Sequence, residues 1–89
     1  MKIRVLEGQS GILRILAFLY APKDPSSLSL IMKKTGVTQV ALYNSLKKAV
    51  ETGLVTEQKE DRFPYRKTIT LTKKGQNIAK LLLEIERNL

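Results

Sequence analysis

The chain of 89 residues suits one small domain, so residues 1–89 are treated as a single folding unit. Its 16 Lys and Arg outnumber its 8 Asp and Glu, which gives a formal net charge of +8 and favours a polyanionic partner such as nucleic acid. Cysteine and histidine are both absent, which excludes disulfides, thiolate chemistry, zinc fingers and histidine-based acid–base catalysis.

Other classes of protein find no support in the sequence. No apolar run reaches the ~18 residues that span a membrane, and the first residues lack the apolar region of a signal peptide. The carboxylates are scattered, and there is neither a glycine-rich phosphate loop nor a cluster of metal ligands. We therefore expect a cytoplasmic protein that is not an enzyme, needs no cofactor or metal, and does not enter a membrane.

The positive charge is concentrated in two windows that contain no acid. Residues 25–50 hold four lysines, and residues 62–83 hold six lysines and arginines. A uniformly solvated surface would mix the two signs, so this segregation strengthens the case for a polyanion. Charge by itself does not separate duplex DNA from RNA.

The N-terminal part is expected to form an arm or strand followed by an apolar helix. Ile3 and Val5 alternate with charged residues, which favours a short strand within residues 1–9. Ser10 is expected to cap a helix over residues 11–20. That helix is apolar on two sides and must be covered on both. Its two stripes are Ile12, Ile15, Leu16 and Leu19, and Leu13, Ala17 and Tyr20.

A loop over residues 21–27 precedes two helices that are joined by a tight turn. Ser29 is expected to cap the first of these helices, over residues 30–35. Gly36 ends it, and the next N-cap, Thr38, follows two positions later. This spacing, with glycine at the corner, is that of a helix-turn-helix. The expected buried residues here are Leu28, Ile31 and Met32.

The second of these helices, over residues 38–53, has one apolar face and one polar face without acid. Leu42, Leu46 and Ala49 recur at helical spacing and point to a core, and Gly53 suits the left-handed position that ends a helix. The other face, which predicts a DNA recognition helix, is equally well explained as a mixed polar surface. It consists of Gln39, Val40, Tyr43, Asn44 and Lys47.

A β-hairpin follows this helix. Strands are expected over residues 54–59 and 65–72, on either side of a polar loop over residues 60–64. Ile69 and Leu71 alternate with threonines and are expected to face inward.

The last helix is expected over residues 73–88, with Thr72 as its N-cap. Its apolar surface is wider than a small three-helix core needs, which predicts a homodimer through this helix and the first one. The alternative is that the two helices cover each other within one subunit. The stripe consists of Ile78, Leu81, Leu82, Ile85 and Leu89, edged by Ala79 and Leu83.

Taken in order, these elements resemble the winged helix-turn-helix domains of bacterial and archaeal transcription regulators, in the broad group of MarR-, ArsR- and PadR-like families. The resemblance is carried by residues 29–38, by residues 42–48 with 53–55, and by Thr70-Leu71-Thr72-Lys73-Lys74-Gly75, which resembles the LT-x-x-G step from wing to final helix. It implies an α+β fold with a three-helix core, a two-stranded β-hairpin wing and a long C-terminal helix. In this scheme residues 10–75 form core and wing, and residues 73–89 serve dimerisation.

The resemblance also implies sequence-specific binding of double-stranded DNA. The third helix would enter a major groove, and the hairpin would contact the backbone or minor groove nearby. The residues implied to face bases are Gln39, Val40, Tyr43 and Asn44, and those implied to face phosphates are Thr38, Lys47 and Lys48. The implied wing contacts are Lys59, Arg62, Arg66 and Lys67.

Two features depart from the pattern of these families. Ala49 stands where a larger apolar residue is usual, so the core is expected to be thinner there or to be filled by Val50. The wing loop carries Glu60 and Asp61, which oppose phosphate, and an apolar run, Phe63-Pro64-Tyr65. The rival function is therefore a winged-helix module for protein–protein interaction without specific DNA binding.

Overall fold

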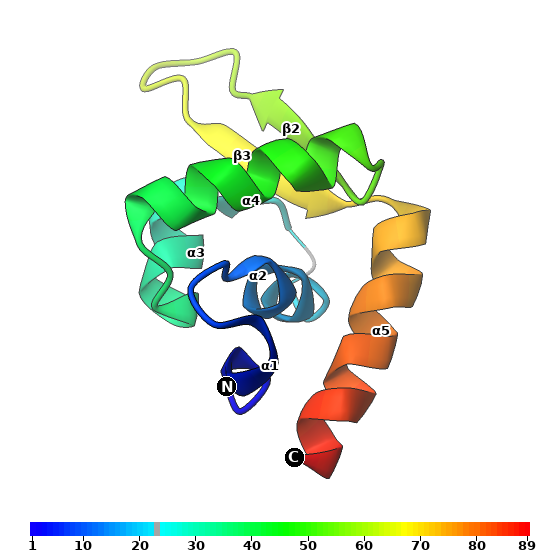
Figure 1. Cartoon of the computed structure of the whole chain (residues 1–89). Helices are drawn as coiled ribbons and strands as arrows, with labels where there is room; N and C mark the ends of the chain where they lie inside the picture. Colours follow the sequence, from blue (N-terminus) through cyan, green and yellow to red (C-terminus); the bar gives the residue numbers. More distant parts are fainter. Residues whose placement is uncertain (23) are drawn as a thin grey trace.

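The computed structural model describes residues 1–22 and 24–89. Within them the chain forms five helices and a three-stranded sheet (Figure 1). The elements in chain order are α1 (Arg4–Glu7), α2 (Ile12–Leu19), β1 (Ser26–Ser27), α3 (Leu28–Thr35), α4 (Gln39–Glu51), β2 (Val55–Lys59), β3 (Lys67–Leu71) and α5 (Lys73–Asn88). This is the winged helix-turn-helix arrangement that the sequence predicts.

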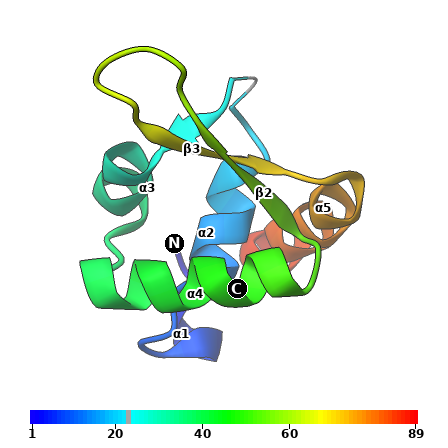
Figure 2. The same cartoon turned by 90° about the horizontal axis from the view of Figure 1, so that it is seen from above.

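Helix α2 lies at the centre, with α3, α4 and α5 packed around it (Figure 2). The core is aliphatic, and its largest fully buried apolar side chains come from the N-terminal segment, from α2, α3 and α4, and from the sheet. They are Ile3, Ile15, Leu16, Ile31, Leu42, Leu46, Val55 and Ile69. The predicted inward face of α4 is confirmed, and Ala49 belongs to it while Val50 is 42% exposed. Val50 therefore does not fill the core in place of Ala49.

The corner between α3 and α4 is built as the sequence predicts. Gly36 has a φ of 73°, in the left-handed region that favours glycine, and its amide donates to the carbonyl oxygen of Met32 at 2.9 Å. The Thr38 hydroxyl accepts from the amide of Ala41 at 3.3 Å and caps α4. The orientation of α4 is thus fixed at its first turn.

The start of α3 differs from the prediction. Residues 26–27 are not loop, because β1 pairs antiparallel with β3, with Ser26 opposite Ile69. Ser27 is extended as part of that strand, and its hydroxyl accepts from the amide of Leu30. Ser27, and not Ser29, is therefore the N-cap of α3, and Leu28 is half-buried in the first turn.

The hairpin of β2 and β3 is confirmed, with Val55 opposite Leu71 and Lys59 opposite Lys67. Of the residues predicted to face inward, Ile69 is buried and Leu71 is half-buried. The step into α5 explains the Thr-x-x-Gly motif. Thr72 caps the helix by accepting from the amide of Gly75, and a Cβ on Gly75 would lie 1.9 Å from the carbonyl oxygen of Leu54. Only glycine allows that approach.

The N-terminal segment is a helical turn and not a strand. Ile3 is fully buried while Val5 is 76% exposed, so the two side chains do not share a face. The amides of Ile3 and Lys2 donate to the Glu86 carboxylate at 2.7 and 2.8 Å. These two bonds, the one from Ile3 first, hold the pKa of Glu86 below its usual value of 4.5. They also tie the first residues to α5, close to the C-terminus (Figure 1).

The start of α2 is capped from a distance. Its N-cap is Gly11, which makes no side-chain bond, so the prediction of Ser10 as cap is wrong. The Glu7 carboxylate instead accepts from the amides of Leu13 and Arg14 and pairs with the Arg14 guanidinium at 2.8 Å. The same guanidinium donates to the carbonyl oxygen of Thr35 at the end of α3. One ion pair therefore joins α1, α2 and the helix-turn-helix corner.

The two apolar helices differ in what their own chain covers. In α2, the residues from Arg14 to Ala17 and Leu19 are buried, so little of this helix is left for a partner. Within the chain α2 packs against α5, as in the alternative in which the two helices cover each other, and a part for α2 in a dimer stays a prediction. On α5 only Gly75, Ala79 and Leu82 are buried. Its outer stripe stays exposed and consists of Ile78, Leu81, Ile85 and Leu89.

Candidate nucleic-acid interface

Helix α4 presents a continuous exposed face. It lies opposite the buried face of Leu42, Ser45, Leu46 and Ala49, because the helical repeat separates the two sets of side chains. Val40 is 71% exposed and Tyr43 is 50% exposed. All of the residues predicted for the recognition helix are exposed, namely Thr38, Gln39, Val40, Tyr43, Asn44, Lys47 and Lys48. No acid occurs between the start of α4 and Glu51 at its end.

The predicted wing residues are exposed on the hairpin. Lys59 and Lys67 face each other as the last pair of the ladder, and Arg62 and Arg66 lie in the loop beyond it. The amide of Glu60 donates to the carbonyl oxygen of Arg66 across the base of that loop, at 2.9 Å. The hairpin loop projects from the same end of the molecule as α4, and α1 and both termini lie at the other end (Figure 1).

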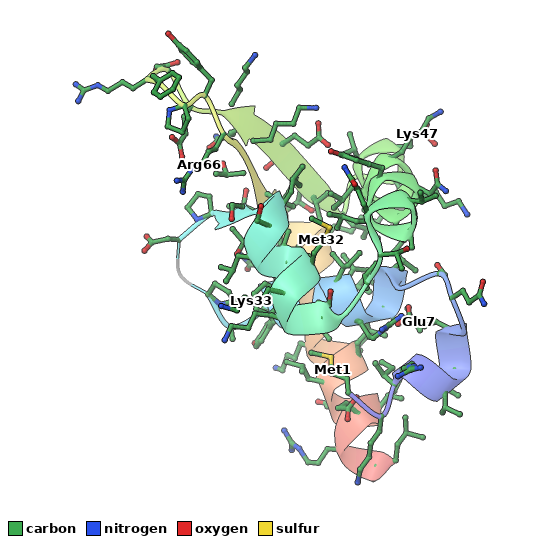
Figure 3. The ribbon with its side chains drawn as sticks, turned by 90° about the vertical axis from the view of Figure 1, so that its left-hand side faces the viewer. Met1, Glu7, Met32, Lys33, Lys47 and Arg66 are labelled. Carbon is green, nitrogen blue, oxygen red and sulfur yellow. The ribbon has the colours of Figure 1, made fainter. Side chains whose placement is uncertain are left out.

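Lys47 and Arg66 mark the relative positions of α4 and the wing. Both lie along the upper side of the molecule, Lys47 on α4 and Arg66 at the base of the wing loop (Figure 3). Among the described residues, Arg14 and Glu7 form the single ion pair. The lysines and arginines of α4 and the wing therefore form no ion pair with a carboxylate of the described residues. The exposed acids on these elements are Glu51 at the end of α4, Glu57 on β2, and Glu60 and Asp61 in the wing loop.

The bases of the two acid-free windows are distributed over α3, α4, the wing and α5. Lys33 lies on the flank of α3 below the level of Lys47 (Figure 3). Lys73, Lys74 and Lys80 lie on α5, where the Lys74 ammonium donates to the carbonyl oxygen of Thr52 at 2.9 Å. Lys74 therefore lies at the C-terminal end of α4, since Thr52 is the C-cap of that helix.

A groove of about 810 Å³ lies between the N-terminal segment and α4. Val40 and Asn44 line one side of it, and Arg4, Gln9 and Ser10 line the other. The Ser45 hydroxyl donates to the carbonyl oxygen of Ser10 at 2.6 Å and holds this segment against α4. The sequence analysis did not predict that Arg4, Gln9 and Ser10 lie beside α4. The one signal in the sequence is that these polar residues precede the start of a helix.

No group of His, Cys, Asp and Glu residues that could hold a metal ion occurs in the part of the chain that the structure describes. None of the described helices is both long and apolar enough to cross a membrane.

Comparison with known proteins identifies related domains. The family model of the ArnR1-like winged-helix domain matches residues 3–88. No curated protein matches the chain. Among solved structures, a MarR-family transcriptional regulator from Silicibacter pomeroyi shares 25% identity with a TM-score of 0.79, over 98% of this chain and 58% of the other. SSV1 F-93 shares 25% identity with a TM-score of 0.74, over 88% of each chain.

A structure of a DNA complex is also similar. The complex of Staphylococcus aureus MepR with DNA has 22% identity and a TM-score of 0.73, over 98% of this chain and 71% of MepR. At that identity the likeness concerns the fold alone. In another structure of MepR, a transcription regulator of the multidrug efflux pump MepA, the chain spans 62% of the length of the regulator. The present chain thus spans about three fifths of the length of that regulator.

Proposed function

Because the chain belongs to the family of ArnR1-like winged-helix domains, we propose that it binds double-stranded DNA in a sequence-specific manner as a transcription regulator. The observation that carries the proposal is the exposed, acid-free face of α4 beside a basic wing at the same end of the molecule. Related folds supply independent support, since one of the similar structures is a complex of a regulator with DNA.

In the proposed complex, α4 lies in the major groove. Gln39 and Asn44 are suited to base edges, because an amide side chain can donate and accept at once and pairs well with adenine. Val40 and Tyr43 add apolar contacts with thymine methyl groups or sugars. Thr38, Lys47 and Lys48 lie at the margins of the same face, where they reach phosphates, and the wing bases neutralise phosphates of the neighbouring groove.

The test is a salt series. Anisotropy of a labelled random-sequence duplex is measured against ionic strength for the wild type and for the double variant Arg62→Ala/Arg66→Ala. If about six phosphates are neutralised, log K falls against log[salt] with a slope near −5. Removal of two phosphate contacts is expected to make that slope shallower by about 1.8.

The matched control removes the same charge elsewhere. Lys80 and Arg87 are exposed on α5, away from α4 and the wing, so Lys80→Ala/Arg87→Ala should leave the slope unchanged. If the wild type shows a slope near zero, the proposal is wrong. If both double variants lose the same amount, the binding reflects net charge and not a defined interface.

We also propose that the protein acts as a homodimer, with α5 supplying the seam. Its outer stripe is exposed, with Leu81 at 54% and Ile85 at 41%. Val5 and Leu6 on α1 are exposed as well, at 76% and 57%. Large apolar side chains repeated along one helix face are expected to be covered by a partner. A dimer would present two α4 helices to a two-fold DNA site.

Sedimentation equilibrium tests the dimer. Leu81→Gln is expected to weaken association by at least tenfold, because it places an amide in the proposed apolar seam. Lys80→Gln, the neighbouring position on the charged side of α5, is the control and should associate like the wild type. If the wild type stays monomeric at high concentration, the proposal of a homodimer is wrong, and the proposal of DNA binding is unaffected.

The rival function is a protein-interaction module. It is favoured by the exposure of Val40 and by Phe63, which is 86% exposed. The two functions separate in the salt series, because an adaptor has no reason to show a steep slope that depends on the wing arginines. The variant Asn44→Ala also distinguishes the two functions. Loss of a base contact changes the preferred DNA sequence of a DNA-binding protein, whereas an adaptor has no preferred DNA sequence.

A further inference from the structure

The wing tip combines apolar rings with positive charge. Phe63 is the most exposed large hydrophobic side chain of the described residues, at 86%. Tyr65, 51% exposed, lies against it edge-to-face, with ring centroids 6.3 Å apart. An apolar ring held open to water at the end of a hairpin contributes nothing to the core, so a contact with another molecule is its best explanation.

The tip holds these rings in place. The amide of Tyr65 donates to the carbonyl oxygen of Arg62 at 2.7 Å, and Tyr65 itself has a φ of 57°, in the left-handed region. The Glu60–Arg66 bond closes the base of the loop. The edge-to-face contact with Tyr65 limits the positions that the Phe63 ring takes up. Phe63 is therefore presented at the apex in a defined direction and does not lie back on the hairpin.

The arginines next to the rings favour an anionic partner. Arg62 precedes Phe63 and Arg66 follows Tyr65, so an arginine adjoins the aromatic pair on each side in sequence, while the acids Glu60 and Asp61 precede Arg62. A matching surface must be apolar in the middle and anionic at both edges. The minor groove of duplex DNA has this character, because stacked bases lie between two rows of phosphates. The position of the tip, beyond α4 at the same end of the molecule, fits a groove next to the one that α4 occupies (Figure 1).

We propose that Phe63 enters the minor groove as an apolar wedge at a base step, with Tyr65 supporting the ring and Arg62 and Arg66 on the flanking phosphates. The inference rests on the proposed function, and it adds that the domain bends DNA at the wing. Partial unstacking of one base step by an apolar side chain kinks the duplex. Flexible pyrimidine–purine steps cost least to deform, so such a step is expected under the wing.

The wedge is tested on a duplex selected by the wild type from a random pool. The duplex carries 2-aminopurine at the flanking steps, which reports unstacking, and a dye pair at its ends, which reports bending. The wild type should raise the 2-aminopurine signal at one flanking step and shorten the end-to-end distance. Phe63→Ala should lose both signals and bind about tenfold more weakly, as expected for loss of one base–aromatic contact. Phe63→Leu, which keeps an apolar wedge, should retain most of the bend.

The salt slope separates this contact from the electrostatic ones. Phe63→Ala removes no charge, so its slope should equal that of the wild type, whereas Arg62→Ala/Arg66→Ala makes the slope shallower. Tyr20→Ala, which removes a 42% exposed aromatic ring at the end of α2 and outside the proposed interfaces, is the matched control and should bend DNA like the wild type. If Phe63→Ala bends and binds like the wild type, the wedge is wrong while the proposed function stands. If the wild type selects no DNA, the proposed function fails as well.

Discussion

Helix α4 and the wing loop both carry candidate DNA contacts, but they are supported in different ways. Four residues of α4 are buried, and its first turn is capped by Thr38. The wing, from Thr56 on β2 through the loop to Lys67 on β3, has no buried residue, and its loop is held by backbone bonds and one aromatic contact. A base is read only by a side chain whose position is fixed, whereas a phosphate is neutralised over a range of positions. Sequence discrimination therefore belongs to α4, and charge and shape belong to the wing.

The largest effect should come from removing the support of α4. Leu46 is 2% exposed and packs in the core, so Leu46→Ala should lower the free energy of unfolding by about 2–5 kcal/mol. Chemical denaturation measures the change. Phe63→Ala, which removes a larger side chain from the wing, should change stability by less than about 0.5 kcal/mol. Equal losses in the two variants would contradict the difference in support between α4 and the wing.

The next effect concerns sequence discrimination. Asn44→Ala is expected to weaken binding to the selected site by about 1–3 kcal/mol and to relax the preference at one base position. Its salt slope should match that of the wild type, because no charge is lost. Site selection with the variant, followed by anisotropy on both selected duplexes, checks this. A shallower slope with an unchanged preferred sequence would assign Asn44 to the DNA backbone.

The acids of the wing loop should have a smaller effect of the opposite sign. Glu60 and Asp61 are exposed and form no ion pair with any described residue, and near phosphate each is expected to oppose binding by about 0.2–1 kcal/mol. Glu60→Gln/Asp61→Asn should therefore bind DNA more tightly at low salt, with a gain that fades as salt rises. Weaker binding by this variant would mean that the acids contact a protein or a cation and that the wing tip is not directed at phosphate.

The smallest effect lies far from both regions. The amides of Ile3 and Lys2 lower the pKa of Glu86. The Glu86 carboxylate therefore stabilises the fold when the pH lies above its usual pKa of 4.5, and this contribution is lost as the pH falls through the lowered pKa. Glu86→Gln should be less stable than the wild type at neutral pH, and the difference should shrink in acid. Thermal unfolding across pH measures it. DNA binding at neutral pH should not change, since α4 and the wing are elsewhere.

Local patterns in the sequence predicted the parts of the fold that depend on neighbouring residues. Gly36 and Thr38 mark the corner and the cap of α4 because backbone conformation and a hydroxyl three residues away decide both features. The spacing of Leu42, Leu46 and Ala49 set the buried face of α4, and with it the exposed candidate residues. Whether those residues contact DNA remains a prediction.

Other features were decided by contacts between residues far apart in the sequence. Ser27 became a cap because β1 pairs with β3, some 40 positions later. The N-terminal segment is held by Glu86, and the start of α2 is capped by Glu7 and not by Ser10. Periodicity in α5 showed one wide stripe, but packing against α2 selected Ala79 and Leu82 and left Leu81 and Ile85 outside.

The sequence by itself determined the helix-turn-helix, the hairpin and the faces of α4, because these follow from turn chemistry and helical repeat within a few residues. Only the tertiary structure decided which apolar side chains are left over and which charges share a surface. The core of a small domain has room for only some of the apolar side chains, and which of them are buried depends on how all helices and strands pack together. The exposed stripe of α5 and the projecting Phe63 are the residues that this packing left outside the core.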